Sequence, residues 1–508
     1  MRAPARATFS AAALYLALLG LVLASAALFL LRERQTGRFW GFALDDSWIH
    51  ATIARNLAEG RGFTFNPGEH AAGSTAPLYT VLLAGLYTLF HNSIWPAKIL
   101  GVLCQWASSA LVYHAMLRID PAGRAKAVLA ALLVALSPVL LWASLSGMEI
   151  PAYLLLVCLG IHWHASGAHV RATATWALGI WLRPDGIFLV ALDLAVTRRD
   201  RWKRLAAAAA IVILYVGFNL VSGGTLFPQT VGAKAHFGFE AVRRTWNLFR
   251  EWGALWGLPY GPAHELEHPV ALLAALAVGA ALLLRKRPLY ALYAVGLPLA
   301  LSLFREHSGS GKRYILYVIP FGMMLAATGL ERLAVRLSPA RPHRLLVALG
   351  AAVLLWQLAY VYKKSDLYGW NVQNINFMQR RMGIWAGAVT GPEDRIATND
   401  IGAIAYFSRR PIVDLMGLVT PQTPLPEALS TYRPALMIIF VDWFKDYAEY
   451  DPKLDTFTFY DADSSHKYMV VAGVELSRNT ISAKDQMLMF RRLDRDSPPP
   501  SRRYLRRY

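Results

Sequence analysis

The sequence predicts a polytopic, all-α membrane bundle with about eleven transmembrane helices, followed by an extracytoplasmic α/β domain. Hydrophobic residues make up 55% of the 508 positions and charged residues only 17%, and the mean hydropathy is +0.34. A soluble chain of this length would be less apolar. Near residue 363 the composition changes to short apolar runs separated by polar turns, which indicates a folded domain outside the bilayer.

The formal net charge of +19 would suggest a nucleic-acid partner in a soluble protein. Here much of the Lys and Arg lies between apolar runs, so membrane topology explains the charge. The bilayer is therefore an expected partner and nucleic acid is not. Cys104 and Cys158 each lie inside an apolar run and indicate neither a disulfide framework nor a cysteine metal site.

The first apolar run, residues 11–31, follows Arg2 and Arg6 as the core of a signal peptide would. At about twenty residues it can also span a bilayer. A cleavage-like Ala-Ser-Ala triplet at 24–26 lies within it, but the run continues to Leu31. We expect a retained helix, with cleavage as the alternative.

Further apolar runs predict the remaining spans. They cover residues 94–117, 127–145, 151–164, 173–182, 186–196, 205–221, 269–284, 288–304, 314–330 and 345–362. Several are shorter than the roughly 20 residues that a perpendicular helix needs. The two runs on either side of Arg183 alternatively form one broken or re-entrant feature.

The apolar stretch 76–90 decides the orientation of every later segment. If it does not cross, the basic clusters near residues 118–126, 198–204, 285–287 and 332–344 all face the cytoplasm, as the positive-inside rule requires. We therefore interpret this stretch as interfacial. The amino terminus is then cytoplasmic, and the outer face carries residues 32–75, 146–149, 183–186, 222–268, 305–313 and everything after Lys363.

Three domains follow from these patterns: a transmembrane domain at 1–362, a soluble α/β domain at 363–496 and a basic tail at 497–508. The soluble part has short apolar runs at 395–398, 411–415, 435–441, 468–472 and 487–490, which are candidate strands. The tail contains three prolines and four arginines and is expected to be disordered.

The sharpest polar signal is the adjacent pair Asp45 and Asp46, shortly after the first span, with His50 one helical turn further on. Carboxylates beside a bilayer are costly unless they bind a cation or manage protons. A carboxylate can take the proton of an acceptor hydroxyl as that hydroxyl attacks. The alternative is a solvated loop or a helix cap, where Asp is common.

Two further outer segments carry charge at the ends of apolar runs. Glu149 follows Ser-Gly-Met, and Arg183 and Asp185 belong to an Arg-Pro-Asp-Gly turn. These groups could line a polar cavity shared with the first loop. Interfacial capping, with Arg183 extended toward the headgroups, is the alternative interpretation.

Basic residues at two more outer positions could bind a phosphate. Gln229 and Lys234 belong to the motif FPQTVGAK, and His307, Lys312 and Arg313 precede the run at 314–330. A phosphate leaving group needs fixed cationic donors, which Arg and Lys at the membrane boundary supply. A flanking residue that only reaches for the interface is the default reading of any single member.

Taken in order, these motifs resemble the GT-C superfamily of glycosyltransferases. The matching segments are LDDSWI at 44–49, ARNL at 54–57, GSTAPL at 73–78, SGME at 146–149, RPDG at 183–186, FPQTVGAK at 227–234, and RY at 313–314. Within the superfamily they are most similar to bacterial cell-wall arabinofuranosyltransferases. The later segments NDIGAIAYF at 399–407 and VDLMGLV at 413–419 look like the soluble part of such proteins.

The resemblance implies an inverting transfer of a sugar from a polyprenyl-phosphate donor to a glycan, glycolipid or glycoprotein acceptor. It also implies a bacterial inner-membrane protein with a cytoplasmic amino terminus. Asp45 and Asp46 match the catalytic pair, with Asp45 expected as the base and Asp46 in a structural or metal-binding role, the metal being Mg²⁺ or Mn²⁺. The expected phosphate ligands are Arg183, Lys234, His307, Lys312 and Arg313. The residues expected to contact acceptor or sugar are His50, Ser74, Glu149, Asp185, Gln229, Trp256 and Tyr260.

The sugar stays open, because Gln229 stands where many relatives carry Asn and relatives also use mannose, glucose or aminoarabinose donors. Two other functions compete with transfer. A transporter of a lipid carrier or solute would usually show paired broken helices in related halves, and no half repeats here. A non-catalytic sugar-binding assembly factor would keep aromatic residues such as Trp252 and Trp256 as stacking surfaces but tolerate loss of the carboxylates.

Overall fold

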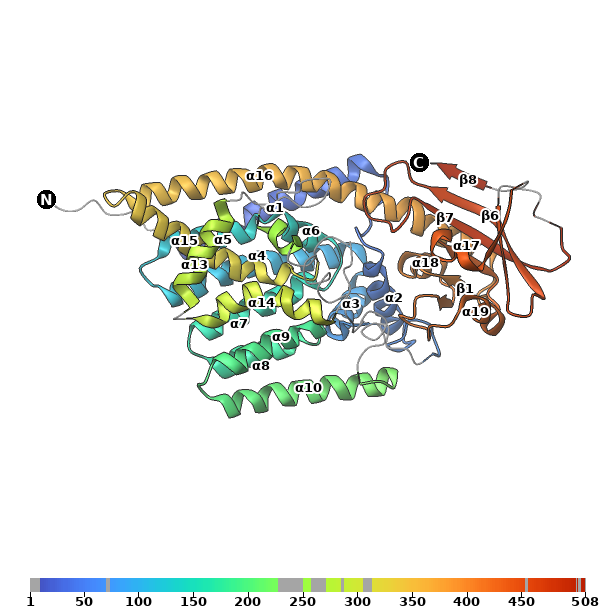
Figure 1. Cartoon of the computed structure of the whole chain (residues 1–508), viewed down its shortest axis with the longest axis horizontal. Coiled ribbons are helices and arrows are strands. Elements are labelled where there is room, and N and C mark those ends of the chain that lie inside the picture. The colour runs from blue at the N-terminus through green and yellow to red at the C-terminus, as the bar shows by residue number, and fades with distance from the viewer. Residues whose placement is uncertain are drawn as a thin grey trace.

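The computed structural model describes residues 10–69, 74–226, 250–256, 271–284, 287–304, 313–452, 456–498, 500 and 504–507. A helical part occupies one side of the molecule and a sheet domain the other, and the long helix α16 connects them (Figure 1).

Within the described residues, five helical segments are long and apolar enough to cross a membrane. They are α1 (Ala11–Thr36), α4 (Ile94–Ile119), α10 (Arg201–Gly223), the segment Leu316–Leu337 formed by η2 and α15, and Pro342–Val389. The bent pair α5 (Arg124–Ala135) and α6 (Pro138–Leu145), at 48°, would form a sixth span. The expected count of eleven is therefore not confirmed, because several of the predicted runs form shorter helices.

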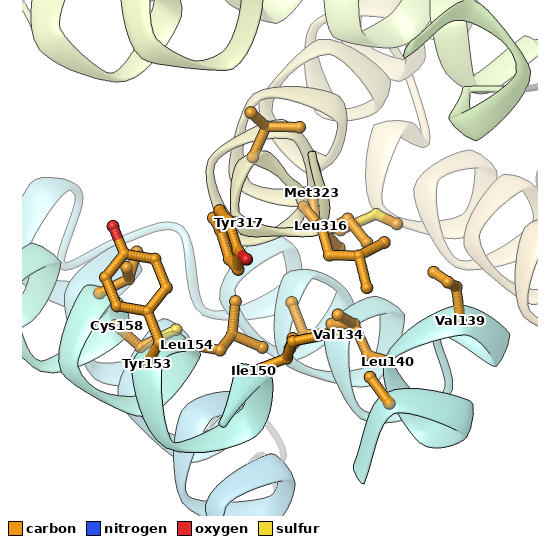
Figure 2. Packing of buried hydrophobic residues seen from close by; sticks show 14 of the residues in the cluster. Val134, Val139, Leu140, Ile150, Tyr153, Leu154, Cys158, Leu316, Tyr317 and Met323 are labelled. Carbon is orange, nitrogen blue, oxygen red and sulfur yellow. The ribbon is translucent and has the colours of Figure 1, made fainter. Parts of the chain in front are cut away.

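The shorter helices fill the space between the long ones. They include α7 (Ile150–Ala165), α13 (Ala271–Leu284) and α14 (Pro288–Phe304). Their apolar side chains join one continuous core with those of the long helices. Figure 2 shows part of it, where Val134 of α5 and Leu154 of α7 pack beneath Leu316 and Met323.

The runs on either side of Arg183 form two short helices, α8 (His169–Gly179) and α9 (Ile187–Val196), joined by the 3₁₀ turn η1 (Pro184–Gly186). At 11 and 10 residues they are each too short to span a bilayer alone. Similarly, α3 (Pro77–Phe90) has 14 residues and exposes Leu89 and Phe90. This length agrees with an interfacial helix.

The boundary between the two parts of the chain lies inside a helix. α16 (Pro342–Ile375) begins at the end of the helical part far from the sheet domain and runs into that domain (Figure 1). It continues through a π-helical turn, η3 (Asn376–Arg380), into α17 (Arg381–Val389). The expected domain break at Lys363 therefore falls within a helix that continues from one part into the other.

The sheet domain holds a mixed eight-stranded sheet in the order β2-β1-β3-β7-β6-β5-β4, with β8 beside β6. β1 (Ile396–Thr398), β2 (Ile412–Asp414) and β3 (Leu436–Ile439) are parallel, and α18 (Gly402–Ser408) and α19 (Leu425–Tyr432) connect them. β4 (Ala448–Asp451), β5 (Thr456–Tyr460), β6 (His466–Glu475) and β7 (Gln486–Asp494) pair antiparallel with one another in this order, and β7 also pairs antiparallel with β3. All five predicted strands are present, and β4 and β5 were not predicted.

Four residues of the basic tail form a strand. β8 (Tyr504–Arg507) pairs in parallel with residues 472–475 of β6. On this edge of β6, β5 pairs only with residues 467–469. β8 therefore supplies backbone partners to residues that β5 does not reach. The arginine-rich composition of the tail did not indicate this strand.

Candidate active site

The candidate site is built around α2 (Asp46–Ala58), which lies between α1 and α3 in the chain, at the junction of the helical part and the sheet domain. Ten of its 13 residues are buried. Its apolar residues Ile49 and Ile53 belong to the core of the sheet domain, together with Ile396 of β1 and Ile404 of α18. Trp48 instead belongs to the core of the membrane helices, so α2 is fixed from both sides.

Asp45 precedes α2 and is held by the sheet domain. Its carboxylate accepts hydrogen bonds from the backbone amides of Gly402 at 2.6 Å and Ala403 at 2.7 Å. A Cβ atom on Gly402 would lie 2.0 Å from the backbone oxygen of Asp45, so only glycine permits this approach. The side chain is 8% exposed.

A second carboxyl group, that of Asp400, forms a hydrogen bond with the Asp45 side chain. Burial raises the pKa of Asp45 well above its usual value, and the charge of Asp400 raises it further. Burial also raises the pKa of Asp400. Two carboxyl groups in contact cannot both ionise without strong repulsion, so the pair shares a proton.

Asp46 has a different environment. One carboxylate oxygen of Asp46 lies 2.6 Å from Nη1 of Arg313, a residue that precedes η2 (Leu316–Val318). The Asp46 side chain is 32% exposed. The Arg313 side chain is only 8% exposed, and its Nε is buried with no hydrogen-bond partner within the described residues. Asp46 is thus the accessible member of the adjacent pair, beside a guanidinium that retains a spare donor.

One turn along α2, His50 reaches the charged turns of the membrane helices. Its Nε2 lies 3.3 Å from Glu149, which caps the start of α7. Glu149 also binds Arg183 at 2.6 Å, and Arg183 forms two bonds of 3.0 Å to Asp185. Burial favours the neutral form of Glu149, but His50 and Arg183 outweigh it and lower its pKa to about 2. Glu149 is therefore an anion at physiological pH.

Tyr314 joins these two groups of charges. The guanidinium carbon of Arg183 lies 5.1 Å from the centre of its ring and that of Arg313 lies 5.0 Å away. Because α2 carries both Asp46 and His50, the contacts close into a ring that runs through Arg313, Tyr314, Arg183 and Glu149 back to α2. The motifs that the sequence separates by up to 267 positions are thus brought together.

The turn before Glu149 depends on Gly147. Its φ is +80°, and a Cβ there would lie 2.3 Å from the ring of Phe42. The carbonyl of Gly147 accepts from the Tyr79 hydroxyl at 2.9 Å, and Ser47 donates to Ser146 at 2.8 Å. These bonds fix the Glu149 turn to α2 and α3.

Ser74 and Trp256, two of the residues expected to contact the sugar, are both buried. Ser74 is buried, hydrogen-bonds Thr80 at 2.9 Å and lies 3.5 Å from Nδ1 of His50, so it supports that imidazole. Trp256 is fully buried, and its ring fills the space above Gly322 of α15 (Ile319–Leu337). Its ring packs in the core of the helical part, and a contact with the sugar stays a prediction.

Five of the expected site residues lie outside the described part of the chain. They are Gln229, Lys234, Tyr260, His307 and Lys312.

A metal role for Asp46 was the remaining expectation. Arg313 contacts one of its oxygens, and the described residues include no group of three or more His, Cys, Asp or Glu side chains arranged to hold a metal ion. The role of Asp46 as a metal ligand therefore stays a prediction.

The structure adds residues that the sequence did not single out as site residues. Asp400 follows the carboxyl end of β1, Gln379 of η3 donates to it at 2.6 Å, and Tyr314 lies between the two arginines. In the sequence, the β1–α18 turn stands out only as part of the segment NDIGAIAYF at 399–407. Its proximity to Asp45 depends on how the domain docks, which no local pattern reports.

A family model described as a domain of unknown function, DUF8728, matches residues 367–490. This range covers most of the sheet domain and includes Gln379 and Asp400. No curated protein matches the sequence.

Solved structures share the fold over most of the chain. ArnT from Cupriavidus metallidurans bound to undecaprenyl phosphate is similar with a TM-score of 0.55 at 13% identity, covering 93% of this chain and 98% of that one. Its apo state gives a TM-score of 0.54 at 14% identity, covering 93% and 97%. The Archaeoglobus fulgidus oligosaccharyltransferase complex with Zn and sulfate gives 0.57 at 13% identity, covering 86% and 72%. At these identities the likeness establishes the fold, a multi-pass helical membrane part followed by a sheet domain.

Proposed function

We propose that this protein is a membrane glycosyltransferase that moves a sugar from a polyprenyl-phosphate donor to an acceptor hydroxyl. The single observation that carries the proposal is the contact of the accessible Asp46 carboxylate with the buried guanidinium of Arg313. Such a pair offers a base for the acceptor and a cation for the phosphate at one point. The shared fold supports the proposal, because one neighbour with that fold holds undecaprenyl phosphate.

The chemistry requires one carboxylate in a defined role. The acceptor oxygen attacks the anomeric carbon, the bond from that carbon to the phosphate oxygen breaks, and the acceptor proton passes to the carboxylate. The lipid phosphate leaves already ionised and needs no acid, unlike the leaving group in most glycoside hydrolases. The configuration at the anomeric carbon inverts.

Asp46 suits the role of base better than Asp45, which reverses the order expected from the sequence. Both oxygens of Asp45 accept backbone hydrogen bonds, and its raised pKa favours the proton-bound form. Asp46 is more exposed and lies beside a cation, which favours its ionised form. Asp45 is then a positioning residue.

The two arginines divide the remaining work. Arg183 already binds two carboxylates, so it holds Glu149 and Asp185 in place rather than binding the donor. Arg313 retains its Nε as a donor for phosphate oxygens, where charge builds up as the sugar leaves. Gln229, Lys234, His307 and Lys312 remain proposed contacts of the donor or the sugar.

The finer assignments also belong to this proposal. The motif order supports arabinofuranose as the sugar and a cell-envelope glycan, glycolipid or glycoprotein as the acceptor. The basic loop at 332–344 and the sheet domain lie at opposite ends of α16, which supports a cytoplasmic amino terminus and an external sheet domain in a bacterial inner membrane.

The test is reconstitution of the purified protein in liposomes with polyprenyl-phosphate donors that carry radiolabelled arabinofuranose, aminoarabinose, mannose or glucose. Wild type should release polyprenyl phosphate in the presence of an envelope-glycan acceptor, and Asp46→Asn should not. Donor binding without turnover in wild type would favour a binding protein. Movement of the intact donor across the bilayer would favour a transporter.

A further inference from the structure

The sheet domain contacts the first outer loop at several independent points. Nη1 of Arg55 donates to the carbonyl of Tyr406 at 2.8 Å, and its guanidinium carbon lies 4.4 Å from the centre of the Tyr406 ring. Asn66 exchanges two hydrogen bonds with the backbone of Ile412 in β2, at 2.8 and 2.9 Å. The loop therefore docks through side chains and backbone alike.

Apolar contacts make the same connection. Ile49, Ile53 and Phe65 from the first outer loop share a core with β1, α17 and α18. Burying side chains of this size contributes about 1.5–3 kcal/mol each. The sheet domain thus lacks part of its core unless α2 is present.

Asp400 is the point where this docking meets the candidate site. It lies in the turn that follows the carboxyl end of β1, the end at which open α/β sheets place functional residues. Its carboxyl group hydrogen-bonds Asp45, and Gln379 donates to it at 2.6 Å from the π-helical turn η3. π-helical turns occur frequently at functional sites.

We propose that Asp400, with the backbone of Gly402 and Ala403, is a positioning element that fixes Asp45 and so orients the first turn of α2 for the reaction. This gives the matched domain of unknown function a role: it completes a site whose charged residues come from the membrane helices. The inference deepens the proposed function and rests on it for the assignment of Asp46 and His50 to the reaction.

The mechanism of positioning is steric and electrostatic. Two amides and one carboxyl group hold Asp45, so its backbone cannot shift, and Asp46 is covalently bound to it. A misplacement of about 1 Å in a reacting group can cost roughly 10²-fold in rate. The charged groups that face the pair are Asp46 on α2 and, beyond it, Arg313, while Gln379 on the other side is neutral.

The test compares Asp400→Ala with Asp400→Asn in the full-length protein, with Asp394→Ala as control. Asp394 is an exposed carboxylate of the same domain that only binds the amide of Gly391. Asp400→Ala should lower kcat by roughly 10²-fold with little change in KM for the lipid donor. Asp400→Asn keeps a donor for Asp45 and an acceptor for Gln379, so it should retain most activity.

The second readout is hydrogen exchange of the α2 amides, which does not depend on activity. Asp400→Ala should speed their exchange and Asp394→Ala should not. In wild type the carboxyl pair needs its shared proton, so α2 protection, corrected for intrinsic exchange, should fall as pH rises through the raised pKa of Asp45. Asp400→Asn should abolish this loss of α2 protection at raised pH. It should also shift the pH at which activity declines on the alkaline side of the pH–activity profile.

The outcomes separate the two proposals. Unchanged kcat and unchanged α2 exchange in Asp400→Ala would overturn the positioning role. If Asp400→Ala does not fold, Asp400→Asn decides the question. The positioning role would be overturned if this variant showed the wild-type pH dependence both of activity on the alkaline side and of α2 exchange. Absence of transfer by wild type with every lipid donor would overturn the proposed function, and α2 exchange would still decide the positioning.

Discussion

Nη1 of Arg313 lies 2.6 Å from the carboxylate of Asp46, although 267 positions separate the two residues. The guanidinium is almost fully buried and the carboxylate is one-third exposed. An ionised carboxylate can thus face a substrate while its partner is held in protein.

Replacement of Arg313 should slow transfer. Arg313→Ala removes the donor proposed for the phosphate and should lower the rate by roughly 10²-fold, and Arg313→Lys should recover only part of it because an ammonium lacks the planar fork. The measurement is release of polyprenyl phosphate by the reconstituted protein. Arg332→Ala, an exposed arginine near the end of α15, is the control. Normal rates in both Arg313 variants would remove this residue from the site.

Loss of Glu149 should destabilise the protein. The side chain is 2% exposed and pairs with both Arg183 and His50, so Glu149→Gln leaves a buried guanidinium with one carboxylate fewer. Breaking a buried pair costs about 3–5 kcal/mol. Thermal unfolding in detergent should show a clear decrease, whereas Glu427→Gln on the exposed side of α19 should not. Equal melting temperatures would contradict the ring of charges.

Glu149 also predicts a pH dependence. Its pKa in the folded protein, about 2, lies below the usual value of a carboxyl group. Its contribution to stability is thus fully present above the unfolded pKa of about 4.3 and is lost as pH falls toward 2. Acid titration of stability between these values should be steeper for wild type than for Glu149→Gln. Parallel curves would count against an ionised Glu149.

Gly147→Ala should be more harmful than Gly167→Ala. Both glycines have nearly the same φ, +80° and +79°, so the backbone strain of substitution is matched. A Cβ at 147 would meet the Phe42 ring at 2.3 Å, whereas no atom of the described residues lies within 4 Å of one at 167. The strain alone costs about 1–3 kcal/mol, and the clash adds to it at 147. Similar losses of stability and activity in both variants would show that the Phe42 contact has no effect.

The buried pair of Lys98 and Glu33 offers a test of how the carboxyl end of α1 and the amino end of α4 are joined. The charged atoms lie 2.5 Å apart, and both side chains are at most 2% exposed. Lys98→Met alone should destabilise the protein by about 3–5 kcal/mol, because Glu33 loses its partner. The double variant Lys98→Met, Glu33→Gln should recover much of this loss in the same unfolding assay. A double variant worse than both single ones would contradict a simple ion pair.

The orientation of the chain in the membrane can be tested as well. A reporter that is active only in the cytoplasm should be silent when fused after Tyr508 and active when fused in the basic loop near residue 339. The second fusion is the internal control for expression. An active reporter after Tyr508 would place the candidate site on the cytoplasmic side.

The sequence by itself determined the class of fold. Long apolar runs require helices in a bilayer because backbone groups find no partners there, so α1, α4 and α10 were readable from composition alone. The same holds for β1, β2, β3, β6 and β7, whose short apolar runs are bounded by turns. The length of the shorter apolar runs was a weaker guide to membrane-spanning helices, and several of these runs form helices too short to cross a bilayer.

The tertiary structure decided how the charged residues divide their work. Asp45 and Asp46 are equivalent in sequence, but one faces the amides of Gly402 and Ala403 and the other faces Arg313. These contacts arise from docking the sheet domain on α2 and from the packing of η2 against the membrane helices. Local patterns report which residue types occur and how they are spaced. They do not report which distant group lies 2.6 Å away, and that distance sets the charge and accessibility of each carboxylate.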